Sequence, residues 1–297
     1  MSGPSPTVRR RRLTAELRQL REATGKTIDE VASNIGMSKS ALSRIENGLV
    51  GVKIPVLRAL MSEYSVTDDR ALALENLAKQ ASQRGWWQVL GGSIPSDQYK
   101  TLVGLEAEAV WVNYYSPNII IGLLQTEDYA RALLEAVAPD ATPEDLELAI
   151  QFRLKRQERL KEMRLWVILS EEGLMRTIGG LETMVNQLKR LIAAGSRDDL
   201  TIQVIGRETG AHIGINGGFT TIGFSSGPQA GAVYVEGHRW DACIEEADQL
   251  VQYMRSFELL RAVALSPAES RVRLETILEG ILDDARRSPQ SSSQELP

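Results

Sequence analysis

Residues 27–48 contain the feature that most constrains the fold: two short helical segments, 28–35 and 39–46, joined by a turn at Gly36. Thr27 and Ser38 each stand where a helix N-cap accepts a backbone N–H. A further helical pattern covers 13–23 before them. Two short helices joined by a three- or four-residue turn containing glycine are typical of a helix-turn-helix. The sequence therefore predicts a small all-α domain at the N-terminus.

The apolar residues of this segment fall where its two helices must bury each other, and Ala32 is small enough for a close crossing. The segment resembles the XRE, or lambda-repressor-like, family of transcription regulators. Four stretches carry the resemblance: Leu17-Arg18-Gln19-Leu20-Arg21, Thr27-Ile28-Asp29-Glu30-Val31-Ala32, Ile35-Gly36-Met37-Ser38, and Leu42-Ser43-Arg44-Ile45-Glu46-Asn47-Gly48.

The resemblance implies that the helix from Lys39 enters the major groove of double-stranded DNA with its N-terminal end first. Lys39 and Ser40 then read base edges, with Arg44 one turn on and Ser43 facing the groove or the nearby backbone. Lysine and arginine can read guanine, whereas serine reads permissively. The full set of implied DNA-contacting residues is Thr27, Ser38, Lys39, Ser40, Ser43, Arg44, Asn47 and Lys53. Of these, Thr27, Asn47 and Lys53 are expected to meet phosphates.

The resemblance also implies a structural ion pair between Arg21 and Glu46 that locks the first helix to the recognition helix. The loop at 49–52 departs from the family pattern because it is nearly apolar, which puts loop contacts to DNA in doubt. The run Arg9–Arg12 has two interpretations: an arm along the phosphates, or a solvated tail.

Charge is distributed unevenly along the 297 residues, whose formal net charge is −5. Residues 1–64 contain eleven lysines and arginines against six acids, whereas the remainder is strongly acidic. This asymmetry favours a polyanion as partner of the N-terminal domain alone. Cys243 is the only cysteine, and no apolar run approaches the ~18 residues of a membrane span. A cytoplasmic protein without disulfides or membrane contact is expected.

The remainder of the chain predicts a mixed α+β domain. Helices are expected over 67–82, 97–111, 126–137, 142–163, 181–194, 241–264 and 267–284, and strands over 165–169, 200–205, 219–224 and 232–235. The 142–163 helix is very polar and has two interpretations, a dimer strut or an exposed face. Residues 286–297 are rich in Ser, Gln and Pro and are predicted to be disordered.

The resemblance extends over about residues 10–280. It includes Gly85-Trp86-Trp87, 105–109, 122–132, 156–158, 210–212 and 233–236. These segments resemble a group of actinomycete XRE regulators, labelled antitoxin-like and of the Scr type, that share a C-terminal domain of unknown function. Membership would imply DNA binding, dimerisation and often a small partner protein encoded nearby. It supplies no biochemical activity for the C-terminal domain.

We find no sequence pattern for catalysis, a cofactor or a metal. The closest metal-ligand cluster is Glu236, His238 and Cys243, which lacks zinc-ligand spacing. The glycines of 214–218 precede a strand, whereas a phosphate cradle needs a following helix, so a turn between strands is favoured. A candidate pocket for a ligand or partner gathers Trp86, Trp87, Trp111, Tyr115 and His212, although ordinary core or domain-docking packing explains them as well.

The sequence thus predicts a multidomain protein. Its parts are a helix-turn-helix domain at 10–66, a connecting helix and junction at 67–95, a mixed α+β regulatory or dimerisation domain at 96–285, and a tail at 286–297. The predicted function is a homodimeric, sequence-specific regulator on a near-palindromic operator. Three alternatives stay open: an antitoxin-type regulator that binds a small protein, a ligand-sensing repressor, and, least favoured, an enzyme with a DNA-binding appendage.

Overall fold

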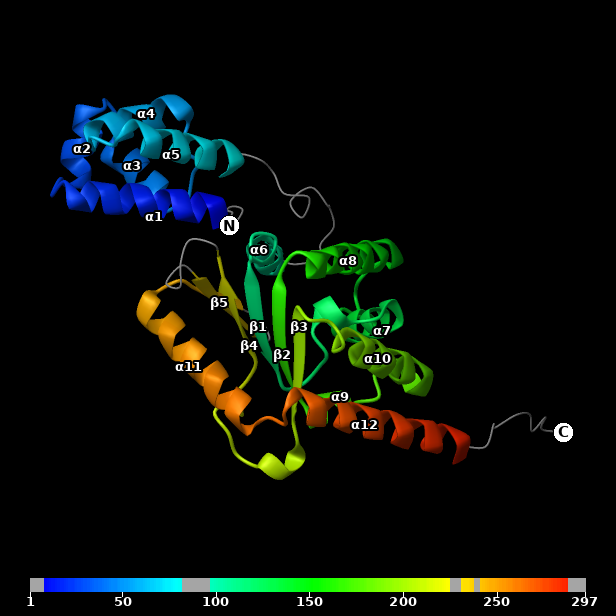
Figure 1. The fold of residues 1–297 in the computed structure, drawn as a ribbon. Helices are drawn as coiled ribbons and strands as arrows, with labels where there is room; N and C mark the ends of the chain where they lie inside the picture. Colours follow the sequence, from blue (N-terminus) through cyan, green and yellow to red (C-terminus); the bar gives the residue numbers. More distant parts are fainter. Residues whose placement is uncertain (1–7, 82–96, 225–230, 238–240, 288–297) are drawn as a thin grey trace. The chain divides into compact units, whose positions relative to one another are not determined.

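The structure is a computed structural model that describes residues 8–81, 97–224, 231–237 and 241–287 (Figure 1). The chain divides into two compact units: residues 1–91 with 95–108, and residues 92–94 with 109–297. Within the described residues, no helix is both long enough and apolar enough to cross a membrane.

The first unit is entirely helical in its described residues. Its helices are α1 (Val8–Ala23), α2 (Ile28–Asn34), α3 (Lys39–Glu46), α4 (Ile54–Glu63), α5 (Asp68–Ala81) and α6 (Asp97–Glu106). Gly36 takes a positive φ of 69°, which an L side chain rarely adopts, and so allows the tight turn between α2 and α3. One core unites α1–α5; its fully buried members include Leu13, Leu17, Val31, Leu42, Leu57, Leu60 and Leu74. Because Leu74 lies on α5, the helix predicted as a connector is part of this core.

The second unit is built on a six-stranded mixed sheet of order β3-β2-β1-β4-β5-β6. Its strands are β1 (Trp111–Ser116), β2 (Arg164–Ser170), β3 (Leu200–Ile205), β4 (Phe219–Gly223), β5 (Gly231–Glu236) and β6 (Asp241–Ile244). Strands β1, β2 and β3 are parallel, with Tyr114 paired to Val167 and Val167 to Ile202. The β1–β4, β4–β5 and β5–β6 pairs are antiparallel.

Helices cover both faces of this sheet (Figure 1). The crossover from β1 to β2 contains the 3₁₀ turn η2 (Gly122–Leu124), α7 (Glu127–Val137), α8 (Pro143–Arg156) and η3 (Gln157–Lys161). Between β2 and β3 lie α9 (Glu171–Leu174) and α10 (Gly180–Ala194), and η4 (Arg207–Thr209) follows β3. After the sheet come α11 (Ala247–Val263) and α12 (Pro267–Arg287).

Alternation along the strands decides which side chains meet which helices, because successive residues of a strand point to opposite faces. Tyr115, Ile168 and Phe219 form a buried cluster with Phe257 and Leu260 of α11. Figure 1 shows α7, α8 and α10 together on the other side of the sheet from α11. Helix α12 packs along β3 and α10.

The predicted combination of an all-α N-terminal domain and a mixed α+β remainder is confirmed, and the four predicted strands are all present. Two predicted helices were wrong in part. The helix expected over 97–111 ends at Glu106, and Trp111 begins the central strand β1. The helix expected from 241 begins only at Ala247, because Asp241–Ile244 pairs with β5 as the edge strand β6.

Two further expectations for the second unit also changed. The polar helix from 142 ends at Arg156 as an α-helix and continues as η3. Its Arg156 is only 2% exposed and donates to the Tyr114 hydroxyl at 2.7 Å, so this helix is not simply an exposed polar face. The last helix reaches Arg287, beyond the predicted start of the tail at 286, and residues 288–297 lie outside the described residues.

Candidate nucleic-acid interface

Local capping fixes the two helices of the motif. The Thr27 Oγ1 accepts from the Glu30 backbone N–H, while the Thr27 N–H donates to Glu30 Oε2 at 2.8 Å, which completes a capping box. Ser38 caps α3 by accepting from the Ala41 N–H. The apolar residues of both helices are buried: Val31 and Ala32 of α2, and Leu42 and Ile45 of α3. The two helices are therefore held together by their apolar faces, with their polar faces outward.

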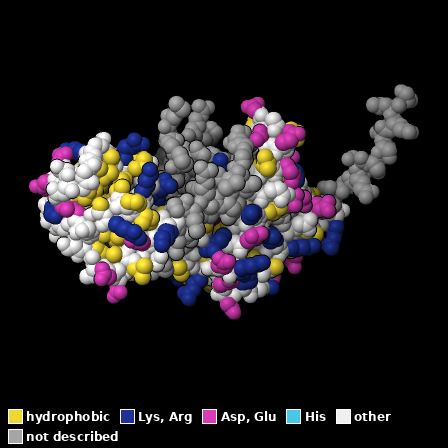
Figure 2. Space-filling model, turned by 90° about the horizontal axis from the view of Figure 1, so that it is seen from above, with side chains coloured by type: hydrophobic (Ala, Val, Ile, Leu, Met, Phe, Trp, Pro, Cys, Tyr) yellow, Lys and Arg dark blue, Asp and Glu magenta, His cyan; other side chains and the backbone are white. Residues whose placement is uncertain are grey.

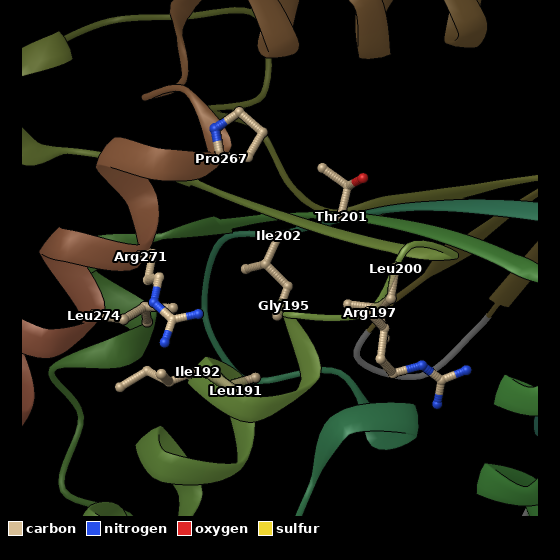
Figure 3. Close-up of a pocket in the computed structure, with 10 residues that line it drawn as sticks. All are labelled: Leu191, Ile192, Gly195, Arg197, Leu200, Thr201, Ile202, Pro267, Arg271 and Leu274. Atoms are coloured by element: carbon tan, nitrogen blue, oxygen red, sulfur yellow. The ribbon is translucent and has the colours of Figure 1, made fainter.

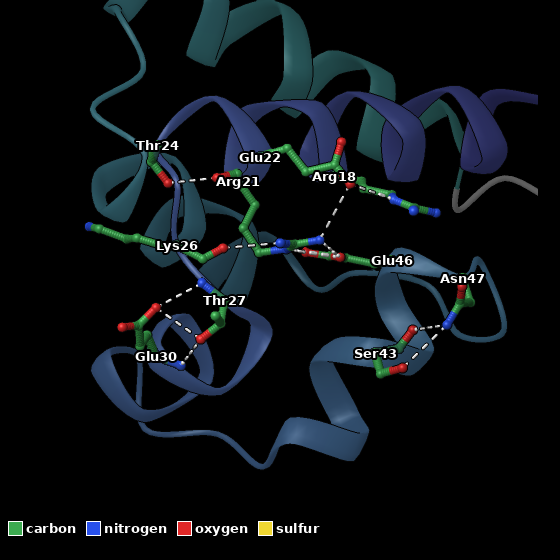
Figure 4. A network of polar contacts seen from close by, with 10 residues as sticks. All are labelled: Arg18, Arg21, Glu22, Thr24, Lys26, Thr27, Glu30, Ser43, Glu46 and Asn47. Atoms are coloured by element: carbon green, nitrogen blue, oxygen red, sulfur yellow. Dashed lines mark hydrogen bonds and ion pairs between the residues drawn. The ribbon is translucent and has the colours of Figure 1, made fainter.

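Arg21 and Glu46 tie α3 to α1 (Figure 4). The Arg21 guanidinium donates from Nε to Glu46 Oε1 at 2.8 Å and from Nη2 to Oε2 at 3.1 Å, and its Nη1 donates to the Lys26 carbonyl. The side chains are only 12% and 3% exposed. Hydrogen bonding to Glu46 raises the pKa of Arg21 above its ordinary value. The structure thus contains the ion pair that the resemblance implied, in a nearly buried, two-bond form.

Helix α3 presents polar side chains to solvent along its length. Lys39, Ser40 and Arg44 are exposed, while Ser43 is half-buried. The Lys39 Nζ forms an ion pair with Asp29 of α2 at 2.5 Å, a contact that sequence reasoning missed. Both partners are largely exposed, so the pair contributes little stability.

The predicted phosphate contacts lie in different surroundings. Asn47 is exposed, but its Nδ2 donates to the Ser43 carbonyl and hydroxyl, so it already serves as an internal brace for the end of α3 (Figure 4). The Thr27 N–H is occupied by Glu30, and the hydrogen bonds from Thr27 lower the pKa of that carboxyl. Lys53 is exposed at the N-cap of α4.

The apolar loop after α3 is close to a basic side chain. The Arg10 guanidinium lies about 4.0 Å from where a Cβ on Gly51 would stand. Arg9–Arg12 belong to α1, which begins at Val8, so this stretch has a helical backbone.

Figure 2 shows acidic and basic side chains closely mixed over the visible surface of the second unit, without one dominant sign.

Comparison with known families also gives two parts, although residues 99–108 fall in the first compact unit and in the second family match. A family model described as a helix-turn-helix domain matches residues 12–74. A second model, the domain of unknown function DUF5753, matches residues 99–276, which is more than half of the chain. The chain belongs to the DUF5753 family. No curated protein and no solved structure matches it. These matches support a helix-turn-helix regulator in general. They do not show membership of the Scr-type, antitoxin-like group.

Within the DUF5753 domain, the predicted pocket residues are only partly brought together. The rings of Tyr115 and His212 meet edge to face, with centroids 6.0 Å apart. Burial raises the pKa of Tyr115 to about 12. Trp111 lies on the same strand, against Gly223, where a Cβ would overlap its ring. Trp86 and Trp87 lie outside the described residues.

A pocket of about 220 Å³ lies elsewhere, between α10, β3 and α12 (Figure 3). Its floor is apolar, with Leu191, Ile202 and Leu274 among the lining residues. Two guanidiniums stand at its rim, and both already bind carboxylates: Arg197 pairs with Asp199 and Arg271 with Glu275. The pocket therefore offers an apolar space but no uncommitted charge to define a ligand.

A buried polar network that sequence reasoning missed holds the irregular segment 122–126. Gln187 of α10 donates to the Leu124 carbonyl at 2.8 Å and accepts from the Thr126 N–H at 2.7 Å. Arg190 donates to the same carbonyl and to Gln157, and burial lowers its pKa. The only feature of the sequence that points to this network is the Gly-Leu-Leu-Gln-Thr stretch at 122–126. Its role in the structure is to join α7, α8 and α10.

The predicted closest metal-ligand cluster lies only partly within the described residues. Among the residues that the structure describes, no group of three or more His, Cys, Asp or Glu side chains could hold a metal ion. Glu236 and Cys243 lie on the adjacent strands β5 and β6, while His238 falls outside the described part of the chain.

Proposed function

We propose that this protein is a sequence-specific DNA-binding transcription regulator in which α3 reads the major groove. The observation that carries the proposal is the exposure of Lys39, Ser40 and Arg44 on one helix whose other face is fixed in the core. A recognition helix must hold its side chains in register with base edges, and burial of Leu42 and Ile45 supplies that rigidity.

Lys39 and Arg44 would provide the base readout, because both can donate to O6 and N7 of guanine. Ser40 would add a permissive contact at the tip of α3. Lys53 and the α2 N-terminus near Thr27 would bind phosphates, which orient the domain without specifying sequence. Glu30 already accepts from the Thr27 N–H. The other backbone N–H groups at the start of α2 would therefore donate to the phosphate.

The proposed functional form is a homodimer on a near-palindromic operator, with two copies of α3 about 34 Å apart in successive major grooves. The DUF5753 domain would supply dimerisation and sense an effector or a small partner protein. The sequence resemblance to the Scr-type, antitoxin-like regulators is a reason to search for such a partner among neighbouring genes.

The deciding experiment is genome-wide mapping of binding sites for the wild type beside a Lys39→Ala/Arg44→Ala double variant. Discrete palindromic sites that disappear in the variant would support the proposal. Ser62→Ala, an exposed change away from α3, is the matched control and should keep every site. Binding that is unchanged by the double variant would refute readout by α3.

A further inference from the structure

Helix α11 carries an unusual number of apolar side chains on its outer surface. Val251, Leu259 and Val263 are 63%, 49% and 44% exposed. No other helix in the described parts of the chain has more than one large hydrophobic residue so exposed. Isolated exposed apolar residues are ordinary, but several along one helix point to an interaction surface.

Two of these residues, Val251 and Leu259, lie on the side of α11 that the sheet does not use. The inner side is occupied by Leu250, Phe257 and Leu260, all buried. We define the outer face of α11 by five residues, which are spaced at i, i+4, i+7, i+8 and i+11 and therefore lie opposite the buried side. They are Val251, Arg255, Glu258, Leu259 and Ala262.

The outer face combines complementary charges at matched positions. Arg255 is exposed and makes no hydrogen bond or ion pair to any other described residue. Glu258 is 63% exposed, and among the described residues it accepts only from Arg261, whose guanidinium lies 3.7 Å above the Trp166 ring. A carboxylate has lone pairs for further donors, so Glu258 can accept from a second arginine.

We propose that the outer face of α11 is a homodimer interface, in which α11 pairs antiparallel with α11 of a second copy about a two-fold axis between Ser256 and Phe257. Antiparallel pairing there brings Arg255 opposite Glu258 of the partner subunit. It also brings Val251 opposite Ala262 of the partner subunit, with Leu259 beside the axis. Two-fold symmetry repeats each contact, so the outer face is complementary to the same face of the second copy.

The size of the surface fits a weak dimer. Seventeen residues make α11 about 25 Å long. Two such faces, each about 10 Å wide, cover about 500 Å² together, which is below the standard range of specific interfaces and predicts a weak dimer. This inference rests on the proposed function, since a near-palindromic operator requires two DNA-binding domains.

The test uses the full chain in sedimentation equilibrium over a concentration series. Wild type should be dimeric, and Leu259→Asp should weaken the dimer about 100-fold because a central apolar contact is replaced by a charge. Val137→Asp is the matched control: Val137 is 66% exposed at the end of α7, and this variant should dimerise as wild type does. Circular dichroism confirms that each variant is folded.

Charge reversal tests the pairing itself. Arg255→Glu and Glu258→Arg should each weaken self-association at least about 10-fold, because like charges then face each other. Mixing the two variants should restore the dimer, because one subunit then carries a carboxylate at both positions and its partner a guanidinium at both. A mixture that stays monomeric, a monomeric wild type, or a wild-type affinity in Leu259→Asp would each overturn the proposal.

The outcomes for this surface and for DNA reading can be told apart. Fluorescence anisotropy with a single half-site measures α3 without requiring a dimer. If Leu259→Asp binds the half-site as wild type does but loses affinity for the full operator, both proposals are supported. If no sequence-specific binding occurs at all while the dimer is intact, the proposed function fails and the interface stands.

Discussion

Replacement of Glu46 by alanine would leave the Arg21 guanidinium without its carboxylate at the junction of α1 and α3. The pair is nearly buried, at 12% and 3% exposure, and has two short N–H···O bonds. Removal of one member of a buried ion pair costs about 3–5 kcal/mol, chiefly because the remaining charge loses its compensation. Arg21 keeps its bond to the Lys26 carbonyl and its ion pair with Glu22 at 3.8 Å, so we expect the lower value, about 3 kcal/mol.

Two further variants separate charge from packing. Glu46→Gln keeps the size and one acceptor oxygen, and should cost about 1.5–3 kcal/mol, the usual worth of a hydrogen bond to a charged group. The double change Arg21→Met/Glu46→Leu removes both charges and should be close to neutral, because buried ion pairs often exchange for apolar side chains without loss. Together with the single variants Arg21→Met and Glu46→Leu, the double change forms a double-mutant cycle for the pair.

The assay is hydrogen exchange of the full chain, read by mass spectrometry on peptides from α1–α3. A loss of about 3 kcal/mol corresponds to roughly 150-fold faster opening. Peptides from α10, in the other compact unit, serve as the internal control and should be unchanged. If Glu46→Ala accelerates exchange of α3 less than about fivefold, the ion pair does not hold α3 in place and the reasoning from its burial is refuted.

Three other changes test separate parts of the structure. Arg44→Ala should weaken binding to the specific site by about 1–3 kcal/mol and relax preference at one base pair; an equal loss on all sequences would mean that Arg44 contacts only phosphate. The buried Tyr64 hydroxyl has no hydrogen-bond partner among the described residues, so Tyr64→Phe should leave the unfolding free energy unchanged or raise it by up to about 1 kcal/mol. Burial raises the pKa of Tyr64 to about 12, above the unfolded value of about 10. The contribution of the protonated Tyr64 to the unfolding free energy is therefore present below pH ~10 and lost as the pH rises toward about 12. A high-pH absorbance titration of wild type against the variant checks this, and a Tyr64 that titrates near ~10 contradicts it. Gly214→Ala would place a Cβ 2.4 Å from the Tyr115 ring and should lower the free energy of urea unfolding by about 1–3 kcal/mol. The control Gly280→Ala, in open space on α12, should raise it by up to about 1 kcal/mol. An unchanged value for Gly214→Ala would show that the loop does not pack on Tyr115.

Much of the first unit could be predicted because its signals are local. The Thr27 cap, the Gly36 turn and the Ser38 cap are each set within a few residues, and each is present in the structure. What the sequence did not show was how the predicted contacts are already occupied. Asp29 binds Lys39, and this contact depends on the positions of side chains once α2 and α3 have formed and packed.

The central strand β1 shows the opposite case. Leu102, Leu105 and Ala109 continue a helical spacing toward Val112, and short apolar runs do not distinguish helix from strand. Pairing with β2 on one side and β4 on the other, both far along the chain, makes Trp111–Ser116 a strand. Asp241–Ile244 becomes a strand through its pairing with β5.

The sequence by itself determined the helix-turn-helix, the class of the second domain and most element positions, because capping, turn chemistry and periodicity act over a few residues. Tertiary structure alone decided that Arg156 is buried against Tyr114, that Gln187 braces Leu124, and that α11 leaves one face uncovered. Each of these depends on which distant segments become neighbours, and burial and hydrogen-bond partners exist only once the sheet and its helices have assembled.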